Sequence, residues 1–329
     1  AEIISMGERL SARVFCSALK DLGVQSVVID PGSEEFPIAT DSNFIEGTPN
    51  LERTKNLAVK YLAPLLGEVI PVVCGFVGRD AEGRVTTLGR GGSDTTATLL
   101  AACLEADEII FVKDIKGILS ADPAIVTNAR ALKKLDIHEM FALCHGGAKV
   151  LKAEALKYKL PGQKLAIVDF SSKNLAKIAT EIVGDFNPSF AEIRQVEGLS
   201  AVTIIGKIDS LTLSRLFTTI NGESVYGIST GQNCVTVFGK FSDIKAIVTR
   251  LHNPDFFKAV TFRNGVGLIE ATHPTFIDSP GWVAKITSSL ALTGINLIEV
   301  TTGKATINLF IDEEKLVKAN TIVRGLFEI

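Results

Sequence analysis

Residues 87–114 read TLGRGGSDTTATLLAACLEADEIIFVKD, and this stretch decides the fold. It contains a β-prone lead-in, a turn with three glycines, an apolar helix pattern and a short continuous apolar run at 109–112. Such a run, bounded by polar residues, is typical of a strand that is buried on both faces of a parallel sheet. The order strand, helix, strand therefore predicts an α/β domain with a mainly parallel sheet.

The same rhythm extends through the first half of the chain. Extended segments are expected at 24–30, 69–78, 84–88 and 165–170, and helices at 11–23, 56–67, 95–106 and 135–159. Asn187-Pro188 then breaks the pattern, because the residue before a proline is disfavoured in helices. We place a domain boundary near 184–190, which gives domains at 1–186 and 187–329.

The second half has a different order. Residues 200–263 read as β-α-β-β-α-β, a ferredoxin-like unit, and residues 266–327 repeat the order but stop one strand short. A missing strand would leave an open apolar edge, which natural proteins avoid. We expect residues 190–196 to fill that place. The first unit, about 198–263, would then be inserted into the second, about 187–197 plus 264–329.

Composition excludes several classes of protein. Of the 329 residues, 46% are hydrophobic. The 34 basic and 37 acidic side chains leave a formal charge of −3, so the protein has no excess of positive charge that would attract nucleic acid or an anionic membrane. The five cysteines are scattered and form no CxxC, which argues against disulfides or a zinc site. No apolar run approaches the ~18 residues of a membrane span. We expect a cytoplasmic protein, or a plastid protein whose transit peptide has been removed.

The turn at 89–92 has the features of an anion site. Glycines let backbone amides face outward, and the start of the next helix adds the positive end of its dipole. Arg90 adds a fork suited to carboxylate or phosphate, and Ser93 is expected to cap the helix. The turn is neither a P-loop nor a dinucleotide fingerprint, because no Lys-Ser/Thr follows and Asp94 replaces the last glycine. A plain turn, with Asp94 stabilised by the helix dipole, is the alternative.

Further polar residues stand at element ends. Lys113 and Asp114 follow a strand at the edge where open α/β sheets bind ligands, although a solvated Lys-Asp pair is equally consistent with the pattern. Glu8 is expected at a helix start. There its carboxylate could bind the ammonium group of a substrate, or it could simply interact favourably with the helix dipole.

The stretch 144–156 reads CHGGAKVLKAEAL, with two glycines before an expected helix that carries Lys149 and Lys152. His145 lacks partners at metal-ligand spacing, so we expect a surface or packing role for it.

These segments resemble one known family. Residues 87–123 resemble the signature of aspartate kinases, and SMGERLSARV at 5–14 resembles that family's SFGERLSA segment. The tandem tail resembles paired ACT domains, which bind amino acids as feedback effectors. GRGGSD is much more specific to aspartate kinases than to other amino-acid kinases, such as glutamate or uridylate kinases. The resemblance implies a three-layer αβα amino-acid-kinase domain followed by two ferredoxin-like ACT domains.

The resemblance also implies an activity. The family uses MgATP to phosphorylate the side-chain carboxylate of L-aspartate, giving 4-phospho-L-aspartate for lysine, threonine and methionine synthesis. ATP and Mg²⁺ bound through it are therefore the implied cofactors, and no protein metal ligand is implied. The implied aspartate-binding residues are Glu8, Arg90, Gly91, Gly92, Ser93 and Asp94, with Arg90 and Asp94 as catalytic residues. The implied nucleotide-binding residues are Lys113, Asp114, Leu119, Lys149 and Val150.

The chain departs from the family pattern in three places. The opening strand and KFGG(T/S) loop are not found, Asp-Pro-Arg becomes Asp122-Pro123-Ala124, and AKVLHP becomes AKVLKA at 148–153. We expect a fragment of a longer enzyme. The alternative is a truncated, non-catalytic ACT-based amino-acid sensor or regulatory subunit with a degenerate kinase lobe.

The resemblance places an effector site in the first ACT-like unit. It falls on Ser224, Val225 and Tyr226, with the polar run that includes Gln232 and Asn233 expected opposite. Lysine or threonine is the implied effector, and a homodimer or higher oligomer through the ACT domains is the implied assembly.

Overall fold

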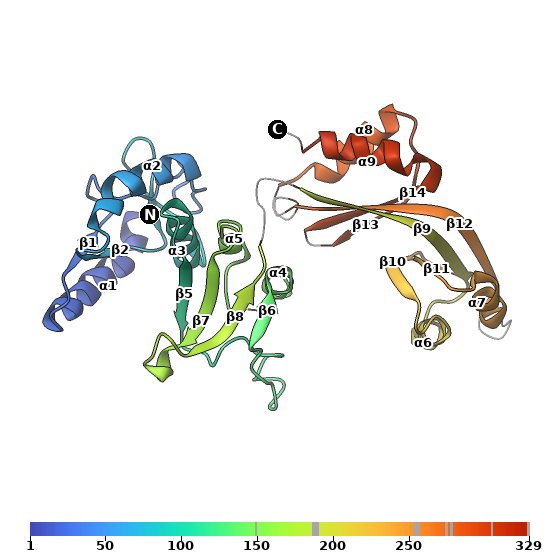
Figure 1. Cartoon of the computed structure of the whole chain (residues 1–329), viewed down its shortest axis with the longest axis horizontal. Helices are drawn as coiled ribbons and strands as arrows, with labels where there is room; N and C mark the ends of the chain where they lie inside the picture. The colour runs from blue at the N-terminus through green and yellow to red at the C-terminus, as the bar shows by residue number, and fades with distance from the viewer. Residues whose placement is uncertain are drawn as a thin grey trace. The chain divides into compact units, whose positions relative to one another are not determined.

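The computed structural model describes residues 1–148, 150–185, 191–252, 257–273, 276, 279–303 and 305–327, without the side chain of His145. The chain separates into two compact units, Ala1–Asn187 and Pro188–Ile329. Figure 1 shows a mixed α/β unit, in blue to green, and a unit built on one long sheet, in yellow to red. The domain limits 1–186 and 187–329 stay a prediction.

The first unit alternates helices and strands. Its helices are α1 (Glu2–Asp21), α2 (Leu51–Tyr61), α3 (Gly92–Cys103), α4 (Ile137–His145) and α5 (Ala153–Leu156), with 3-10 turns at Ala63–Leu65 and Phe170–Ser172. Its strands are β1 (Ser26–Ile29), β2 (Ile70–Val73), β3 (Val77–Arg79), β4 (Val85–Thr87), β5 (Glu108–Lys113), β6 (Lys134–Asp136), β7 (Lys164–Asp169) and β8 (Ile178–Val183).

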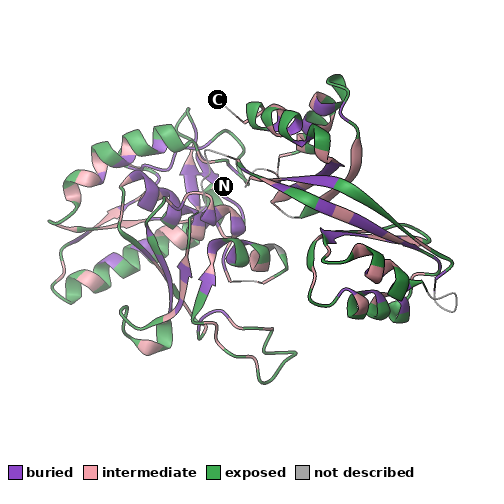
Figure 2. Ribbon diagram, turned by 45° about the vertical axis from the view of Figure 1, so that its right-hand side comes forward, coloured by how far each residue is buried: buried purple, intermediate pink, exposed green. Residues whose placement is uncertain are grey.

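Most of the strands in this unit pair in parallel. β1 pairs with β2, β5 with β7 and β6 with β8 in parallel, whereas β7/β8 and β3/β4 are antiparallel. Strands of this unit carry long buried segments, drawn in purple in Figure 2. The apolar strand β7 is almost wholly buried, as its sequence LAIV predicts, and Leu99 of α3 is fully buried. The α/β class expected for this unit is confirmed.

Two local predictions for this unit are wrong. The sequence predicts Glu8 at the start of a helix, but α1 begins at Glu2, so Glu8 lies inside α1 rather than in its first turn. The segment 69–78 is not one strand, because the backbone turns between β2 and β3 at Phe76, whose φ is +69°. A positive φ is incompatible with a continuing strand.

The helical stretch expected at 135–159 is not continuous, and the helix expected to carry Lys152 after the two glycines begins only at Ala153. The stretch contains two helices, α4 and α5, and an intervening loop that carries Val150 and Lys152. Gly147 has a φ of +102°, which only glycine adopts without strain, and this turn ends α4. Lys152 therefore precedes α5 as its N-cap residue instead of lying within a helix.

The second unit contains α6 (Ser210–Thr219), α7 (Ile244–Leu251), α8 (Trp282–Leu292) and α9 (Leu316–Gly325), with a 3-10 turn at Glu313–Lys315. Its strands are β9 (Glu192–Ile205), β10 (Ser224–Thr230), β11 (Cys234–Lys240), β12 (Ala259–Thr272), β13 (Leu297–Gly303) and β14 (Thr306–Asp312).

The described strands of this unit form one antiparallel sheet in the order β10-β11-β9-β12-β14-β13. β9 and β12 are long, and each serves both halves of the sheet. The first part of β9, Glu192–Val196, pairs with the end of β12, while its second part pairs with β11 and the start of β12. Each half thus has the strand order of a ferredoxin-like unit.

Each half has its own core on the helical side. Leu216 and Ile247 of α6 and α7 pack over the first half, and Ile286 and Val323 of α8 and α9 pack over the second. A third cluster contains the stacked rings of Phe238 and Phe310, whose centroids are 4.0 Å apart. In the described part of the chain, no helix is both long and apolar enough to cross a membrane.

Candidate functional site

A cavity of about 520 Å³ lies beside the start of α3 in the first unit. Three chain segments meet there: the glycine turn, the end of β5, and the loop from α4 to α5. Its lining residues are Arg90, Gly91, Asp94, Lys113, Cys144, Gly147, Ala148, Val150, Leu151, Lys152, Ala153 and Glu154. The turn and the strand end, which are 19 residues apart from Asp94 to Lys113, therefore contribute to one site.

The turn that opens this cavity depends on glycine. Gly89 and Gly91 have φ values of +69° and +76°, and Gly91 is the N-cap of α3. A Cβ at Gly92 would lie 2.8 Å from the Leu88 Cβ and 3.1 Å from the Phe76 Cα. Left-handed backbone and close packing together explain the three glycines. The expectation that Ser93 caps α3 is wrong, because the helix begins at Gly92 and Ser93 is exposed in its first turn.

Asp94 connects the three segments. Its Oδ1 accepts a hydrogen bond from the Lys113 Nζ at 2.7 Å, in an ion pair whose carboxylate side chain is only 12% exposed. Its Oδ2 accepts from the backbone N–H of Lys152 at 3.3 Å. A partly buried, charge-assisted contact of this kind is stronger than an exposed ion pair. Asp94 thus holds both Lys113 and the α4–α5 loop at the cavity.

Two other cations line the cavity. Arg90 is exposed, and its guanidinium has no hydrogen-bond or ion-pair partner among the residues that the structure describes. The Lys152 Nζ donates to the Leu88 carbonyl at 3.3 Å. Burial raises the pKa of the Cys144 thiol to about 11, so it lines the cavity as a neutral group.

Some of the expected site residues lie outside the lining of this cavity. Gly92 is buried beneath the turn, and Asp114 is exposed just after β5. Leu119 forms an isolated bridge with Ala131. Lys149 lies outside the described residues, whereas Val150 lines the cavity as expected.

Ser93 and Glu8 also lie outside the lining of this cavity. A Cβ at Gly75 would be 3.1 Å from the Ser93 Cβ, so the residue after Cys74 packs against the start of α3. Glu8 is half-buried in α1, and its charge is one of the influences that raise the pKa of Cys74, behind burial and Asp30. The charge of Glu8 thus acts on Cys74, the residue that follows β2.

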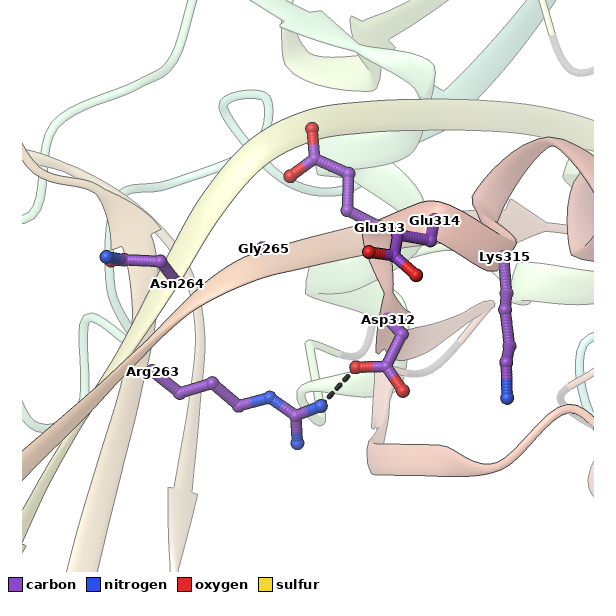
Figure 3. A pocket seen from close by; sticks show the side chains of 7 residues that line it. All are labelled: Arg263, Asn264, Gly265, Asp312, Glu313, Glu314 and Lys315. Atoms are coloured by element: carbon purple, nitrogen blue, oxygen red, sulfur yellow. Dashed lines mark hydrogen bonds and ion pairs between the residues drawn. The ribbon is translucent and has the colours of Figure 1, made fainter.

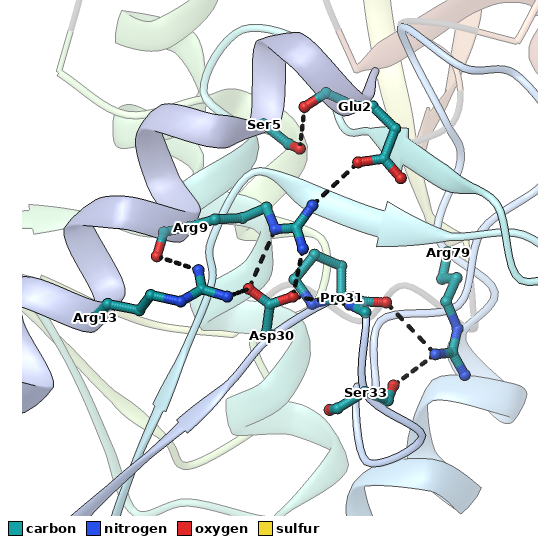
Figure 4. Close-up of polar contacts among 9 residues, drawn as sticks. Glu2, Ser5, Arg9, Arg13, Asp30, Pro31, Ser33 and Arg79 are labelled. Atoms are coloured by element: carbon teal, nitrogen blue, oxygen red, sulfur yellow. Dashed lines mark hydrogen bonds and ion pairs between the residues drawn. The ribbon is translucent and has the colours of Figure 1, made fainter.

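An ion-pair cluster that the sequence analysis missed lies at the end of β1 (Figure 4). Asp30 accepts from the Arg9 Nη2 at 2.7 Å and the Arg9 Nε at 3.1 Å, and it forms a second ion pair with the Arg13 Nη2 at 2.7 Å. It also accepts from the Gly32 backbone N–H at 2.9 Å. Burial pushes the pKa of Asp30 upward, but the Arg9 hydrogen bonds, the Gly32 N–H and both arginine charges outweigh it and hold that pKa below its usual value. The cluster fixes α1, and with it Glu8, against β1.

The expected effector residues do not form one site within the second unit. Ser224 and Val225 begin β10 and lie opposite Lys240 and Gly239, not opposite the polar run. Gln232 and Asn233 follow the other end of β10. At the usual rise per residue of a strand, that end is about 20 Å from Ser224. Tyr226 packs against the Phe238–Phe310 cluster.

A second cavity, of about 630 Å³, lies in that unit at the junction of its two halves (Figure 3). It is lined by the bulged segment Arg263–Gly265 and by Asp312–Lys315, and Arg263 forms an ion pair with Asp312. The Glu313 carboxylate accepts from the Gly198 N–H at 3.1 Å. Within the described residues, no group of three or more His, Cys, Asp or Glu side chains could hold a metal ion.

Several known proteins with related sequences are aspartokinases. An aspartokinase from Bacillus sp. strain MGA3 is 28% identical over 99% of this chain and 81% of its own length. One from Rickettsia prowazekii is 39% identical over 48% of this chain and 35% of its own length. The resemblance to aspartate kinases is thus confirmed over almost the whole chain.

Solved structures agree on the fold. Aspartokinase III from E. coli, in complex with aspartate and ADP, has a TM-score of 0.53 at 23% identity, covering 99% of this chain and 74% of its own. Aspartate kinase from Synechocystis has a TM-score of 0.68 at 21% identity, covering 99% and 58%. The family model of the amino acid kinase family matches residues 1–169, just over half of the chain. The chain therefore belongs to the amino acid kinase family.

Proposed function

We propose that this protein is an aspartate kinase, which transfers the γ-phosphoryl group of ATP to the side-chain carboxylate of L-aspartate. The observation that carries the proposal is the cavity where Arg90, Asp94 and Lys113 meet, because it joins the GRGGSD turn to the strand end KD. The similarity to aspartokinases over 99% of the chain supports the same activity. The product, 4-phospho-L-aspartate, feeds lysine, threonine and methionine synthesis.

The reaction depends on neutralising phosphate charge more than on acid–base catalysis. A side-chain oxygen of aspartate forms the new bond to the γ-phosphorus, the bond to the β-phosphate oxygen breaks, and ADP leaves with that electron pair. The attacking carboxylate is already ionised at neutral pH, since its usual pKa is about 3.9, so no general base is required. Positioning and neutralisation of phosphate charge are the tasks left to the protein.

We propose these tasks for named residues. Arg90 has no competing partner in the described part of the chain and binds a carboxylate of aspartate through its fork. Glu8, fixed through the Arg9–Asp30 contact, binds the ammonium group. Asp94 acts by holding the Lys113 ammonium at the cavity, and Lys113 and Val150 contact the nucleotide.

Further expected residues complete the proposed site. Gly91, Gly92 and Ser93 shape the aspartate side, and Asp114, Leu119 and Lys149 belong to the nucleotide side. Magnesium bound to ATP would supply neutralisation of phosphate charge at this site. The Asp94 carboxylate, which Lys113 and the Lys152 N–H already occupy, fits poorly as a direct ligand of that ion.

The second unit is proposed as the regulatory part, a pair of ACT domains with limits near 187–329. Lysine or threonine would bind at Ser224–Tyr226. β10 lies at the edge of the sheet, and an edge strand can pair with a second copy of itself. Such a homodimer would bring the edge strands of two subunits together.

Formation of aspartyl hydroxamate from aspartate, ATP and hydroxylamine by this protein tests this function. Absence of product with both substrates saturating would refute it. Calorimetry then separates the alternative, because amino-acid binding without any nucleotide binding is the behaviour of a sensor.

A further inference from the structure

Lys152 is a cavity residue that the sequence analysis placed in a helix and gave no role. Its side chain lies across the glycine turn, since a Cβ at Gly91 would be 2.7 Å from the Lys152 Cβ and 3.1 Å from its Cδ. Its backbone N–H is held by Asp94 at 3.3 Å. The stem of Lys152 is therefore fixed at two points, and its ammonium group is held beside the cavity.

The charge of Lys152 is not neutralised by a neighbour. Lys113, the other lysine of the cavity, is paired with Asp94 at 2.7 Å. The Lys152 Nζ instead meets the neutral Leu88 carbonyl at 3.3 Å, and no carboxylate lies within ion-pair distance in the described ranges. An ammonium has three donors, so two remain for a ligand.

The side-chain chemistry distinguishes Lys152 from Arg90. A guanidinium fork matches the two oxygens of a carboxylate, whereas a lysine ammonium binds phosphate as a compact point charge. Val150, two residues earlier in the same loop, also lines the cavity. Within the described part of the loop, Lys152 is the uncompensated cation, and it lies on the side of the cavity that we assign to nucleotide.

We propose that Lys152 is a further binding residue of this site and contacts the phosphate oxygens of the nucleotide. This inference rests on the proposed kinase function. It assigns to the α4–α5 loop a direct part in neutralising phosphate charge, while Arg90 binds the amino acid.

Calorimetry with ADP, adenosine and aspartate tests the assignment. Lys152→Met keeps the stem and removes the charge, and Lys152→Arg keeps the charge. We expect Lys152→Met to weaken ADP binding about 10- to 100-fold, as for one charge-assisted hydrogen bond, and to leave adenosine and aspartate binding unchanged. Lys152→Arg should retain most of the ADP affinity. Lys20→Met, at an exposed lysine in the last turn of α1, is the control and should change none of the three.

Each other outcome has a defined meaning. If the unaltered protein binds ADP and Lys152→Met binds it equally well, Lys152 is not a phosphate ligand. Weaker aspartate binding with unchanged ADP binding would overturn the assignment to nucleotide. Failure of the unaltered protein to bind either ADP or aspartate would refute the kinase proposal itself. Circular dichroism of each variant separates loss of binding from loss of folding.

Discussion

Replacing Gly91 by alanine tests how the turn and the α4–α5 loop fit together. Two costs follow from the structure. The first is the backbone cost of a left-handed residue at φ +76°, about 1–2 kcal/mol for a residue with a Cβ. The second is the contact of the new methyl with the Lys152 Cβ at 2.7 Å, well inside the usual ~3.5–4.0 Å, which costs about 1–3 kcal/mol as overpacking.

Gly83 offers a matched control for the free-energy cost of placing a Cβ on a left-handed residue. Its φ is +83°, and a Cβ there would meet nothing within 4 Å. Gly83→Ala should therefore cost about 1–2 kcal/mol, and Gly91→Ala about 2–5 kcal/mol. The difference between the two variants isolates the contact with Lys152.

The assay is urea unfolding followed by two signals. Far-UV circular dichroism reports both units, whereas Trp282, the sole tryptophan, reports the second unit only. Gly91→Ala should lower the midpoint of the first unit and leave the tryptophan transition in place. A shift no larger than that of Gly83→Ala would refute the packing argument. In a Lys152→Gly background, the extra cost of Gly91→Ala should disappear.

Three further predictions concern other contacts. Arg90→Ala should lower kcat/KM for aspartate about 30-fold, because a contact worth about 2 kcal/mol is lost. The control Arg53→Ala, at an exposed position of α2, should leave kcat/KM unchanged. An unchanged aspartate dependence in Arg90→Ala would make Arg90 a structural residue. Phe310→Ala should destabilise the second unit by about 3–5 kcal/mol in urea unfolding, because its fully buried ring stacks on Phe238; a loss below 1 kcal/mol would contradict that packing. The hydrogen bond from Lys159 lowers the pKa of Asp185 in the folded protein. The ionised Asp185 therefore stabilises the fold fully above about pH 4, and this stabilisation is lost as the pH falls through the lowered pKa. Urea unfolding should show that the midpoint falls less between pH 4 and pH 2 in Lys159→Met than in the unaltered protein.

Much of the site follows from local sequence. Glycines beside Arg90 and Asp94, placed between a strand and a helix, require a left-handed turn whose polar residues reach the cavity, and Lys113 ends the next strand in the chain. The sheet places the end of that strand near the start of the helix before it, which is why these residues meet. The ferredoxin-like order of the second unit follows from alternation in the same way.

The missed features depend on contacts between distant residues. Nothing in the sequence near Asp30 indicates that Arg9 and Arg13 will bind it, because α1 and β1 must first pack together. The break between α4 and α5 did have a local signal, Gly146-Gly147, but strong helix formers on both sides obscured it. Whether glycines end a helix or merely weaken it is decided by the φ that the packing demands, here +102° at Gly147.

That break has a consequence for the chemistry. A continuous helix through 135–159 would have held residues 148–152 in helical hydrogen bonds, and the Lys152 N–H could not then have bonded to Asp94. Because α4 ends before Gly147, this N–H is free of helical bonding and the loop folds over the turn, where Gly91 leaves room for the lysine stem. Two glycines 56 residues apart in the sequence, at 91 and 147, thus serve one contact. A substitution that extends α4, such as Gly147→Ala, should disturb the cavity without touching any of its charged groups.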